Sequence, residues 1–221
     1  MKLPKIYKDK DADIGLIKDK CVAIIGYDNQ GRAQALNLRD SGVDVRIGLR
    51  EESDSRVKAG TEGFISLSIK EAVENCDILS ILVPDQVMGE VYQDCIAPNM
   101  KEGQTLLFSH GYNIHYGVIQ PPIFINIVMA APSGAGTELR KRYIDGSGIP
   151  GLFAVHQDCS GDSEKIILAY CRAIGLTKYG VVESTFKEET ETDLFGEQII
   201  LTGGIPKLIQ SSYKVLLEAR Y

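Results

Sequence analysis

Three carboxylates near the carboxyl end of the chain have a spacing that suits metal chemistry. Glu189, Asp193 and Glu197 fall at i, i+4 and i+8, which places them on one face of a helix. Like charges at this spacing repel by about 0.2–0.5 kcal/mol per pair, so the pattern opposes helix stability unless a cation compensates. Mg²⁺ is commonly held by one or two carboxylates with water completing its shell. The alternative is acids that complement a helix dipole, which explains Glu197 poorly because it lies beyond the first turn.

A histidine and a glycine-containing loop each follow a predicted strand. His110 comes after the strand predicted over residues 104–109, and Pro-Ser-Gly-Ala-Gly at 132–136 ends the strand predicted over 123–131. In doubly wound α/β sheets the ligand sits beyond the carboxyl ends of the strands. His110 is therefore a candidate catalytic residue, and a purely structural histidine is the alternative interpretation.

A short turn joins a predicted strand to a predicted helix near the start of the chain. The apolar run from Cys21 ends at Gly26, a helix-forming segment starts near Gln30, and a second apolar run covers residues 43–49. A strand, a tight glycine turn and a helix at this spacing are typical of a dinucleotide-binding βαβ unit. The candidate cofactor-binding residues of the turn are Gly26, Asp28, Asn29, Gln30 and Gly31.

One position departs from the Gly-x-Gly-x-x-Gly pattern of such turns, because Asp28 replaces the second glycine. That glycine normally lets the backbone approach the pyrophosphate, so Asp28 adds a Cβ and a negative charge there. A like-charge pair about 5 Å apart costs roughly 3 kcal/mol at an effective dielectric near 20, about a hundredfold in affinity. Two interpretations stay open: the domain keeps its fold but has lost tight nucleotide binding, or Asp28 points outward and is tolerated.

The residues after the second apolar run could select the cofactor. In this fold the tip of the second strand contacts the adenosine ribose, where an acid selects NAD and an arginine selects the 2′-phosphate of NADP. Arg50, Ser53 and Ser55 suit a phosphate, and we favour NADP on these residues. Neighbouring acids weaken the prediction by repulsion, and a solvated turn that opens a helix is the alternative. Those acids are Glu51, Glu52 and Asp54.

The elements that must position these residues alternate at short spacing from Cys21 to Ile174. The alternation predicts an α/β fold, a doubly wound Rossmann-type, mainly parallel sheet with helices on both faces. A helix over residues 68–75, a buried strand over 77–84, and a helix capped by Asp85 and ending at Asp94 are among its elements. The predicted domain covers residues 1–182.

The pattern changes at Glu183, and residues 183–221 are predicted to form a short all-α tail. A capping box, Thr185-x-x-Glu188, opens a first helix that carries the carboxylates, and a second helix follows residues 203–206, Gly-Gly-Ile-Pro. The second helix has more apolar residues than an isolated helix pair could bury. We therefore expect the two helices to pack on the sheet domain or on another chain.

Composition excludes several classes of protein. The 221 residues carry a formal net charge of −6 and no basic cluster, which argues against binding nucleic acid or an anionic membrane. No apolar run approaches the ~20 residues of a membrane span, and the amino terminus lacks the apolar stretch of a signal peptide. The 5 scattered cysteines contain no Cys-x-x-Cys pair, so we expect them to be reduced in a cytoplasmic protein.

Four segments occur together in one known family. They are residues 26–45 around the glycine turn, 108–117 around His110, 154–158, and 185–198, Thr-Phe-Lys-Glu-Glu-Thr-Glu-Thr-Asp-Leu-Phe-Gly-Glu-Gln. From about Ile6 to its end the chain resembles ketol-acid reductoisomerase of the short class I form, and the last segment is very specific to that family.

The resemblance implies an NADP-binding Rossmann domain followed by a knotted, dimeric all-α domain, so a homodimer through the helical tail is expected. It implies an Mg²⁺-dependent alkyl shift in 2-acetolactate or 2-aceto-2-hydroxybutyrate, then hydride reduction to the 2,3-dihydroxy acid, in branched-chain amino-acid synthesis. The substrate would be a 2-hydroxy-2-alkyl-3-keto acid and the cofactors NADP(H) and Mg²⁺, with the metal acting as a Lewis acid.

The resemblance also assigns roles to single residues. Asp193 and Glu197 match the two metal carboxylates of the first helix of the helical domain, and His110 matches the active-site histidine. Gly136 matches a glycine beside the cofactor. The remaining matches belong to the 2′-phosphate loop and to a segment on the adenine side, and they are Arg50, Ser53, Ser55, Asp85, Gln86, Val87 and Met88.

The chain departs from the family at Asp28, and at Ser133 and Ala135, which replace the active-site lysine and the second proline of one loop. Family members continue past the position of Tyr221 with a second pair of glutamates and a substrate-binding serine. We therefore expect a truncated homologue with weak or no activity as this chain alone. The alternatives are a split enzyme, completed by another polypeptide, and a non-catalytic nucleotide-binding or dimerising module.

Overall fold

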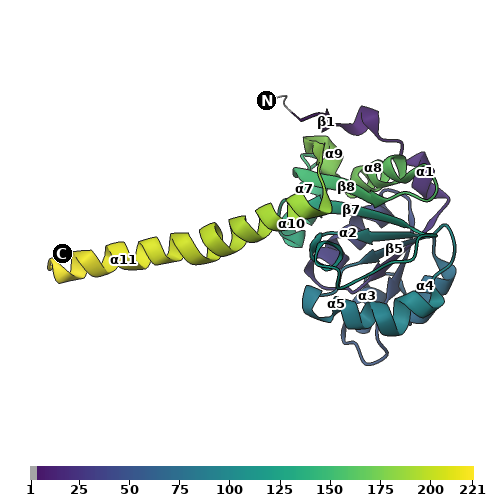
Figure 1. Ribbon diagram of the computed structural model, residues 1–221, viewed down its shortest axis with the longest axis horizontal. Coiled ribbons are helices and arrows are strands. Elements are labelled where there is room, and N and C mark those ends of the chain that lie inside the picture. The colour runs from purple at the N-terminus through teal and green to yellow at the C-terminus, as the bar shows by residue number, and fades with distance from the viewer. Residues whose placement is uncertain (1–3) are drawn as a thin grey trace.

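A nine-stranded sheet forms the centre of the molecule (Figure 1), as described for residues 4–221 by a computed structural model. The strand order is β1-β9-β8-β7-β6-β5-β2-β3-β4, and only β7 with β8 and β1 with β9 run antiparallel. The predicted mainly parallel sheet is confirmed, although residues 1–3 of the predicted domain lie outside the described residues. The strands are β1 (Ile6–Tyr7), β2 (Cys21–Ile25), β3 (Asp44–Gly48), β4 (Ile65–Leu67), β5 (Ile78–Ile81), β6 (Thr105–Phe108), β7 (Asn126–Pro132), β8 (Gly151–Gln157) and β9 (Val181–Glu183).

Helices cover both faces of this sheet. The α helices are α1 (Gly15–Lys18), α2 (Asn29–Asp40), α3 (Ser55–Thr61), α4 (Ile69–Asn75), α5 (Asp85–Val91), α6 (Tyr112–His115), α7 (Gly136–Ile144), α8 (Ser163–Ala173), α9 (Leu176–Tyr179), α10 (Phe186–Leu194) and α11 (Ile205–Glu218). Short 3₁₀ turns are η1 (Asp9–Asp11) and η3 (Ala97–Asn99), and π segments are η2 (Tyr92–Ile96) and η4 (Phe195–Gly204). One apolar cluster lies under α2, α7 and α8, and a second lies under α4, α5 and the start of α10.

The apolar run of β2 shows why both faces must be covered. Val22 and Ile24 point into the cluster under α2 and α8, whereas Ala23 and Ile25 point into the cluster under α4 and α5. Successive side chains of a strand face opposite sides, so a strand apolar at every position needs helices on both. All four residues are fully buried.

The strand order reverses between β2 and β5. From β2 the chain moves outward to β3 and β4, then crosses back to β5, β6 and β7 on the other side. Such a reversal opens a crevice at the carboxyl ends of the strands, where open α/β sheets bind ligands. The loops that start after β2, β5, β6 and β7 therefore meet at one edge of the sheet.

The start of α5 differs from the prediction that Asp85 caps it. Pro84 is the N-cap residue, Asp85 is the first helical residue, and its Oδ1 accepts a hydrogen bond from Nδ2 of Asn113 at 2.9 Å. The carboxylate therefore accepts from a side chain of α6 and does not cap the backbone of its own helix. Helical structure continues past the end of α5 as the π segment η2, so the predicted end at Asp94 is close.

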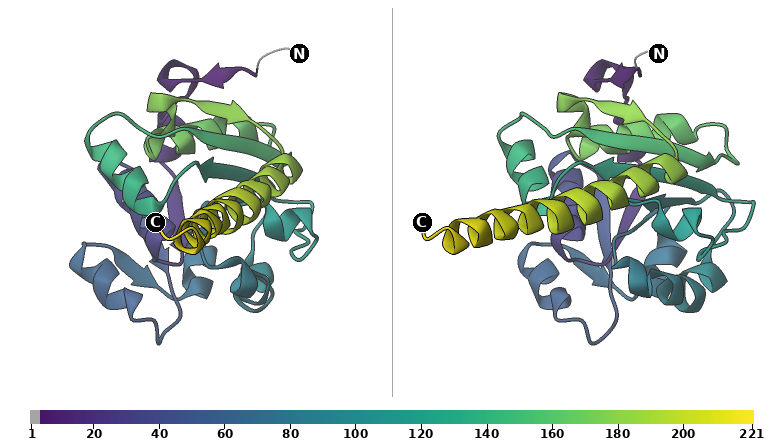
Figure 2. Two further views of the ribbon diagram at one scale, coloured as in Figure 1. Left: turned by 90° about the vertical axis from the view of Figure 1, so that its left-hand side faces the viewer. Right: turned by 60° about the vertical axis from the view of Figure 1, so that its left-hand side comes forward.

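The carboxyl-terminal tail is one continuous rod, whereas two separate helices were predicted. α10, η4 and α11 follow each other without a break and run straight away from the α/β body (Figures 1 and 2). A Cβ on Gly203 would overlap the carbonyl oxygen of Gln198, so this glycine admits the π turns where a break was expected. Every residue from Glu197 onward is exposed. The prediction that the tail packs on the sheet domain is therefore wrong beyond α10. Packing of the tail on another chain stays a prediction.

The cysteines differ in part from the expectation that all are reduced. Cys21 at the start of β2 and Cys76 just before β5 are joined in a disulfide, with Cα atoms 4.6 Å apart. The two strands are neighbours in the sheet, a proximity that the cysteine spacing did not indicate. Cys95, Cys159 and Cys171 are free. Within residues 4–221, no helix combines the length and hydrophobicity needed to cross a membrane.

Candidate active site

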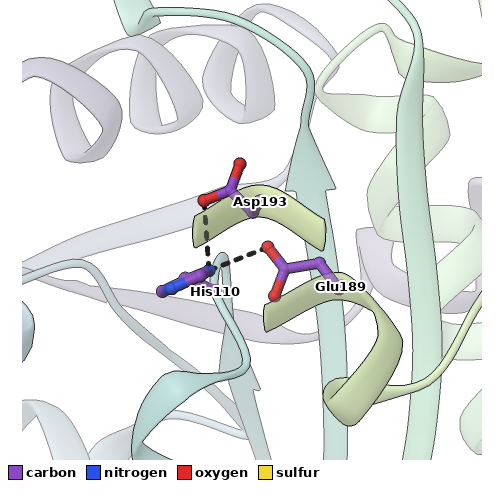
Figure 3. Close-up of side chains that lie close together, drawn as sticks. All are labelled: His110, Glu189 and Asp193. Atoms are coloured by element: carbon purple, nitrogen blue, oxygen red, sulfur yellow. Dashed lines mark hydrogen bonds and ion pairs between the residues drawn. The ribbon is translucent and has the colours of Figure 1, made fainter. Parts of the chain in front are cut away.

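His110 and Glu189 form a hydrogen-bonded pair at the carboxyl edge of the sheet (Figure 3). Nδ1 of His110 lies 2.9 Å from Oε1 of Glu189, and Oε2 of the same carboxylate accepts the backbone N–H of Gly111 at 2.7 Å. Because the carboxylate is the acceptor, we assign the proton to Nδ1, which leaves Nε2 for a ligand. The structure therefore gives the predicted histidine an orienting partner from a distant part of the chain.

Local contacts bring the start of α10 to this loop. The side chain of Thr185 accepts the N–H of Glu188 at 3.0 Å, which is one half of the predicted capping box. The ring of Phe186 packs edge-on against Phe108 of β6, with centroids 6.0 Å apart. A Cβ on Gly111 would overlap the carbonyl oxygen of Phe186, so glycine is needed for this close approach.

Asp193 and Glu197 continue the same face of the helix. Oδ2 of Asp193 lies 3.7 Å from Nδ1 of His110, and His110, Glu189 and Asp193 each offer a ligand atom within 4.8 Å of one another. Glu197 lines the same cavity one turn further on. Glu189 and Asp193 of the predicted face thus point at the histidine, and Glu197 lines the cavity beside them.

The electrostatics of this cluster favour a positive charge in the cavity. Burial raises the pKa of Asp193, and the charge of Glu197 raises it further. Burial lowers the pKa of His110, but the hydrogen bond to Glu189 and the nearby charges of Asp85 and Asp193 outweigh it, so the pKa is raised. Oxygen ligands that repel one another around an open space fit a hard divalent cation.

A cavity of about 790 Å³ joins this cluster to the glycine turn. Asn29 and Gln30 of the turn line one side, the loop 132–136 lines another, and residues of α10 and η4 between Glu189 and Leu201 close a third. No lysine or arginine is among the described residues that line it. The carboxylates of the helix therefore dominate the charge of the cavity.

The glycine turn has the backbone that a dinucleotide-binding turn requires. Gly26 has a φ of 98°, in the region that favours glycine, and a Cβ on Gly31 would overlap the carbonyl oxygen of Gly26. These two glycines perform the tight turn and the close packing of helix on strand.

The loop after β7 packs directly on this turn. Nε2 of Gln30 donates to the carbonyl oxygen of Gly134 at 2.8 Å, and the N–H of Thr137 donates to Oδ1 of Asn29 at 3.1 Å. A Cβ on Gly136 would overlap the backbone of Asn29. Gly136, which was predicted to lie beside a cofactor, thus allows the loop after β7 to pack closely on the glycine turn.

Asp28 lies outside the main cavity. The residue is exposed and lines an adjoining groove of about 260 Å³ together with Arg32, Lys58 and Arg140. Its side chain does not cap α2, although its carbonyl oxygen accepts the N–H of Arg32 at 2.8 Å. The exposure of Asp28 favours the interpretation in which its carboxylate points outward and is tolerated.

The predicted phosphate loop follows β3, the neighbour of β2. The side chains of Arg50, Ser53 and Ser55 form no hydrogen bond or ion pair with any residue in the described part of the chain, so their donors are free. On the adenine side, Gln86 is exposed and Val87 half-buried. Met88 is only 4% exposed and packs in the second apolar cluster, which leaves little of its surface for a ligand.

Two functional partners were not assigned from the sequence. Glu189 was placed on the correct helical face, but its bond to His110 spans 79 residues and no local pattern indicates it. Gln34 is fully buried in α2 and donates to Oγ of Ser109 at 2.9 Å, next to His110. Tyr170 in turn donates to Gln34 at 2.7 Å. A glutamine on the apolar face of a helix was the available signal.

Two family models match nearly all of the chain. The model of the acetohydroxy acid isomeroreductase NADPH-binding domain matches residues 16–180, and that of the ketol-acid reductoisomerase C-terminal domain matches residues 186–221. The chain belongs to the ketol-acid reductoisomerase family. The resemblance noted from the sequence is thereby confirmed.

Individual relatives agree with this assignment. The ketol-acid reductoisomerase (NADP(+)) of Methanocaldococcus jannaschii is 52% identical over 217 residues, which are 98% of this chain and 66% of that protein. The enzyme of the same name from Petrotoga mobilis is 50% identical over 215 residues, 97% of this chain and 65% of that protein. The chain thus spans just under two thirds of the length of these ketol-acid reductoisomerases.

Solved structures confirm the fold. An NADH-preferring ketol-acid reductoisomerase from an uncultured archean has a TM-score of 0.94 and 44% identity, covering 98% of this chain and 67% of that one. A pyrroline carboxylate reductase of Plasmodium falciparum, solved with NADP bound, has a TM-score of 0.59 at 16% identity. At 16% identity, the similarity to the pyrroline carboxylate reductase shows only that the two proteins share a Rossmann-type fold.

Proposed function

We propose that this chain is the nucleotide-binding part, and one wall of the metal site, of a ketol-acid reductoisomerase. The reaction is an alkyl shift in 2-acetolactate or 2-aceto-2-hydroxybutyrate followed by reduction with NADPH, in branched-chain amino-acid synthesis in the cytoplasm. Residues 1–182 are the nucleotide-binding domain and 183–221 belong to the helical domain. The observation that carries the proposal is the single cavity that holds both the glycine turn and the His110–Glu189–Asp193 cluster.

The dinucleotide lies across the carboxyl edge of the sheet. The pyrophosphate sits at the start of α2, where backbone N–H groups and the helix dipole favour an anion. The free donors of Arg50, Ser53 and Ser55 bind the 2′-phosphate, and the segment 85–88 borders the adenine. The nicotinamide then extends past Gly136 and the loop after β7 toward His110, which lines the same cavity.

Asp193 and Glu197 hold Mg²⁺, and Glu189 acts as the orienting partner of His110. Both oxygens of Glu189 already accept hydrogen bonds and the side chain is 5% exposed, so it has little capacity for a metal. When bound, Mg²⁺ supplies Lewis-acid polarisation of the substrate oxygens. Nε2 of His110, kept in place by Glu189, exchanges a proton with a substrate oxygen.

The substrate is a 2-hydroxy-2-alkyl-3-keto acid, and turnover by this 221-residue polypeptide alone is weak or undetectable. Three features support low turnover. Ser133 occupies the position of the family's lysine, and the described residues that line the cavity include no fixed cation to bind the substrate carboxylate. The metal carboxylates also come from a single helix, so they approach an ion from one side.

A second candidate function is a dimerising or split-enzyme module, and the apolar surface of the rod favours it. Leu208, Ile209, Val215 and Leu216 are each more than half exposed along α11. An apolar face of this length is typical of a protein interface. We therefore propose a homodimer through this tail. Sedimentation should give a dimer, and a monomer at micromolar concentration would exclude this assembly.

The nucleotide part of the proposal is tested by titrating NADPH into the chain and following its fluorescence. We expect saturable binding by the wild type and loss of binding in Gly31→Ala, whose new Cβ would overlap the carbonyl oxygen of Gly26. Gly60→Ala is the matched control, because a Cβ there meets no atom within 4 Å. Absence of NADPH binding in the wild type would contradict the proposed function.

A further inference from the structure

Arg56 closes the carboxyl end of two neighbouring strands. Its Nε donates to the carbonyl oxygen of Arg50 at 2.9 Å, and its Nη2 donates to those of Leu49 at 2.9 Å and Leu67 at 3.2 Å. Leu49 directly follows β3 and Leu67 ends β4, so a single guanidinium ties both strand ends to the loop between them.

These bonds fix the backbone of the predicted phosphate loop. The carbonyl oxygen of Arg50 accepts from Nε of Arg56 and from the N–H of Ser53 at 3.2 Å, while the N–H of Arg56 donates to the carbonyl oxygen of Ser53 at 3.0 Å. The loop is thus held at both ends by one residue. Its conformation decides where the side chains of Arg50, Ser53 and Ser55 point.

The same arrangement separates the two serines and Arg56 from the acids of the loop. Ser53, Ser55 and Arg56 are half-buried, whereas the intervening acids Glu51, Glu52 and Asp54 are exposed, as is Arg50 at the start of the loop. Nη1 of Arg56 makes no hydrogen bond within the described residues, so part of its charge stays available. A loop with more acids than bases can select an anion only if its bases are positioned toward it and its acids are turned to solvent.

We propose that Arg56 is the positioning residue for discrimination between NADPH and NADH. It holds the loop so that the three free side chains converge on the 2′-phosphate, and it adds a second guanidinium beside that group. The inference rests on the proposed nucleotide-binding function, since it concerns only how the adenosine end of that site is shaped. Binding of NADH, which carries a neutral 2′-hydroxyl at this position, does not depend on this arrangement.

Arg56→Lys tests the inference because it keeps the charge but removes the planar fork that reaches three carbonyl oxygens. Dissociation constants for NADPH and NADH are measured by fluorescence titration of the full chain. We expect the dissociation constant for NADPH to rise about tenfold, because a charge-assisted contact to the 2′-phosphate loses its position. The dissociation constant for NADH should change by less than about twofold. Arg46→Lys is the matched control and leaves both constants unchanged, because Arg46 lies in the middle of β3 and pairs only with Asp44 among residues 4–221.

The possible outcomes separate the inference from the proposed function. If the wild type binds NADPH and Arg56→Lys shifts both constants equally or neither, the positioning role is wrong while the nucleotide site stands. If the wild type binds neither nucleotide, the nucleotide site itself is wrong, and the inference falls with it. Arg56→Gln, expected to reduce NADPH affinity more than Arg56→Lys, gives the same comparison if the lysine variant does not fold.

Discussion

The rod that starts at Phe186 has two parts of opposite character. In α10, Phe186, Glu189 and Thr190 are buried against the α/β body, whereas Phe195 and the residues of α11 are exposed. Figure 2 shows the rod leaving the body. The first part takes its position from the α/β body through Gly111 and the Glu189–His110 bond. The difference shows that the packing of α10 positions the candidate site, whereas the exposed continuation adds only Gly196, Glu197 and Leu201 to the lining of its cavity within the described residues.

Substitutions of two phenylalanines, one in each part of the rod, should give the largest difference in the free energy of unfolding. Phe186→Ala removes a ring that is 4% exposed, and we expect it to lower the free energy of unfolding by about 3–5 kcal/mol. Phe195→Ala removes a ring that is 59% exposed, and its effect should stay within about 0.5 kcal/mol. Urea denaturation measures both. Equal effects would show that the two parts of the rod are not distinct.

Two ion pairs give a smaller contrast. Glu62 accepts from Nε of Arg32 at 2.9 Å and from the hydroxyl of Tyr27 at 2.6 Å, next to the glycine turn. We expect Glu62→Gln to destabilise the chain by about 1–2 kcal/mol at pH 7, allowing for solvent screening. In the rod, Lys214 and Glu218 form an exposed pair at 3.7 Å, and Glu218→Gln should have no measurable effect.

The pH dependence of this contrast has a definite sign. The hydrogen bond from Arg32 lowers the pKa of Glu62 below its ordinary 4.5 in the folded protein. Stabilisation by this carboxylate is therefore complete above pH 4.5 and is lost as the pH falls through the lower folded-state pKa. Wild-type and Glu62→Gln stabilities should converge in acid. A difference that grows as the pH falls would contradict the assignment.

Substitution of Asp28 should have the smallest effect. Asp28 belongs to the α/β body, but its side chain is as exposed as those of the rod. If the carboxylate points outward, as its exposure indicates, Asp28→Gly should improve NADPH affinity by less than about tenfold, or 1.4 kcal/mol. Asp28→Asn, which removes only the charge, separates electrostatic from steric contributions. A hundredfold gain in the glycine variant would instead place the side chain in the pyrophosphate site.

Much of the body could be predicted from the sequence because its signals are local. The apolar run of β2, the glycine turn and the alternation of elements each depend on neighbouring residues, and they led to the correct fold. Glu189, Asp193 and Glu197 were placed on one face by helical spacing alone. Such patterns predict which residues share an element and a face.

The missed features depend on contacts between distant segments. The bond between Glu189 and His110 and the pairing of Cys21 with Cys76 need the sheet to be assembled before the residues meet. The continuous rod through Gly203 depends on a π geometry that helix propensities do not encode. Asp85 was expected to cap a helix, but its carboxylate accepts from the side chain of Asn113 in α6 instead.

The central claim is that one cavity holds both the nicotinamide and the metal. Mn²⁺, used as a paramagnetic substitute for Mg²⁺, should broaden the nicotinamide proton resonances of bound NADPH more strongly than the adenine resonances. Asp193→Asn should remove the effect while NADPH still binds. Equal broadening of the two rings, or none at saturating Mn²⁺, would contradict the account.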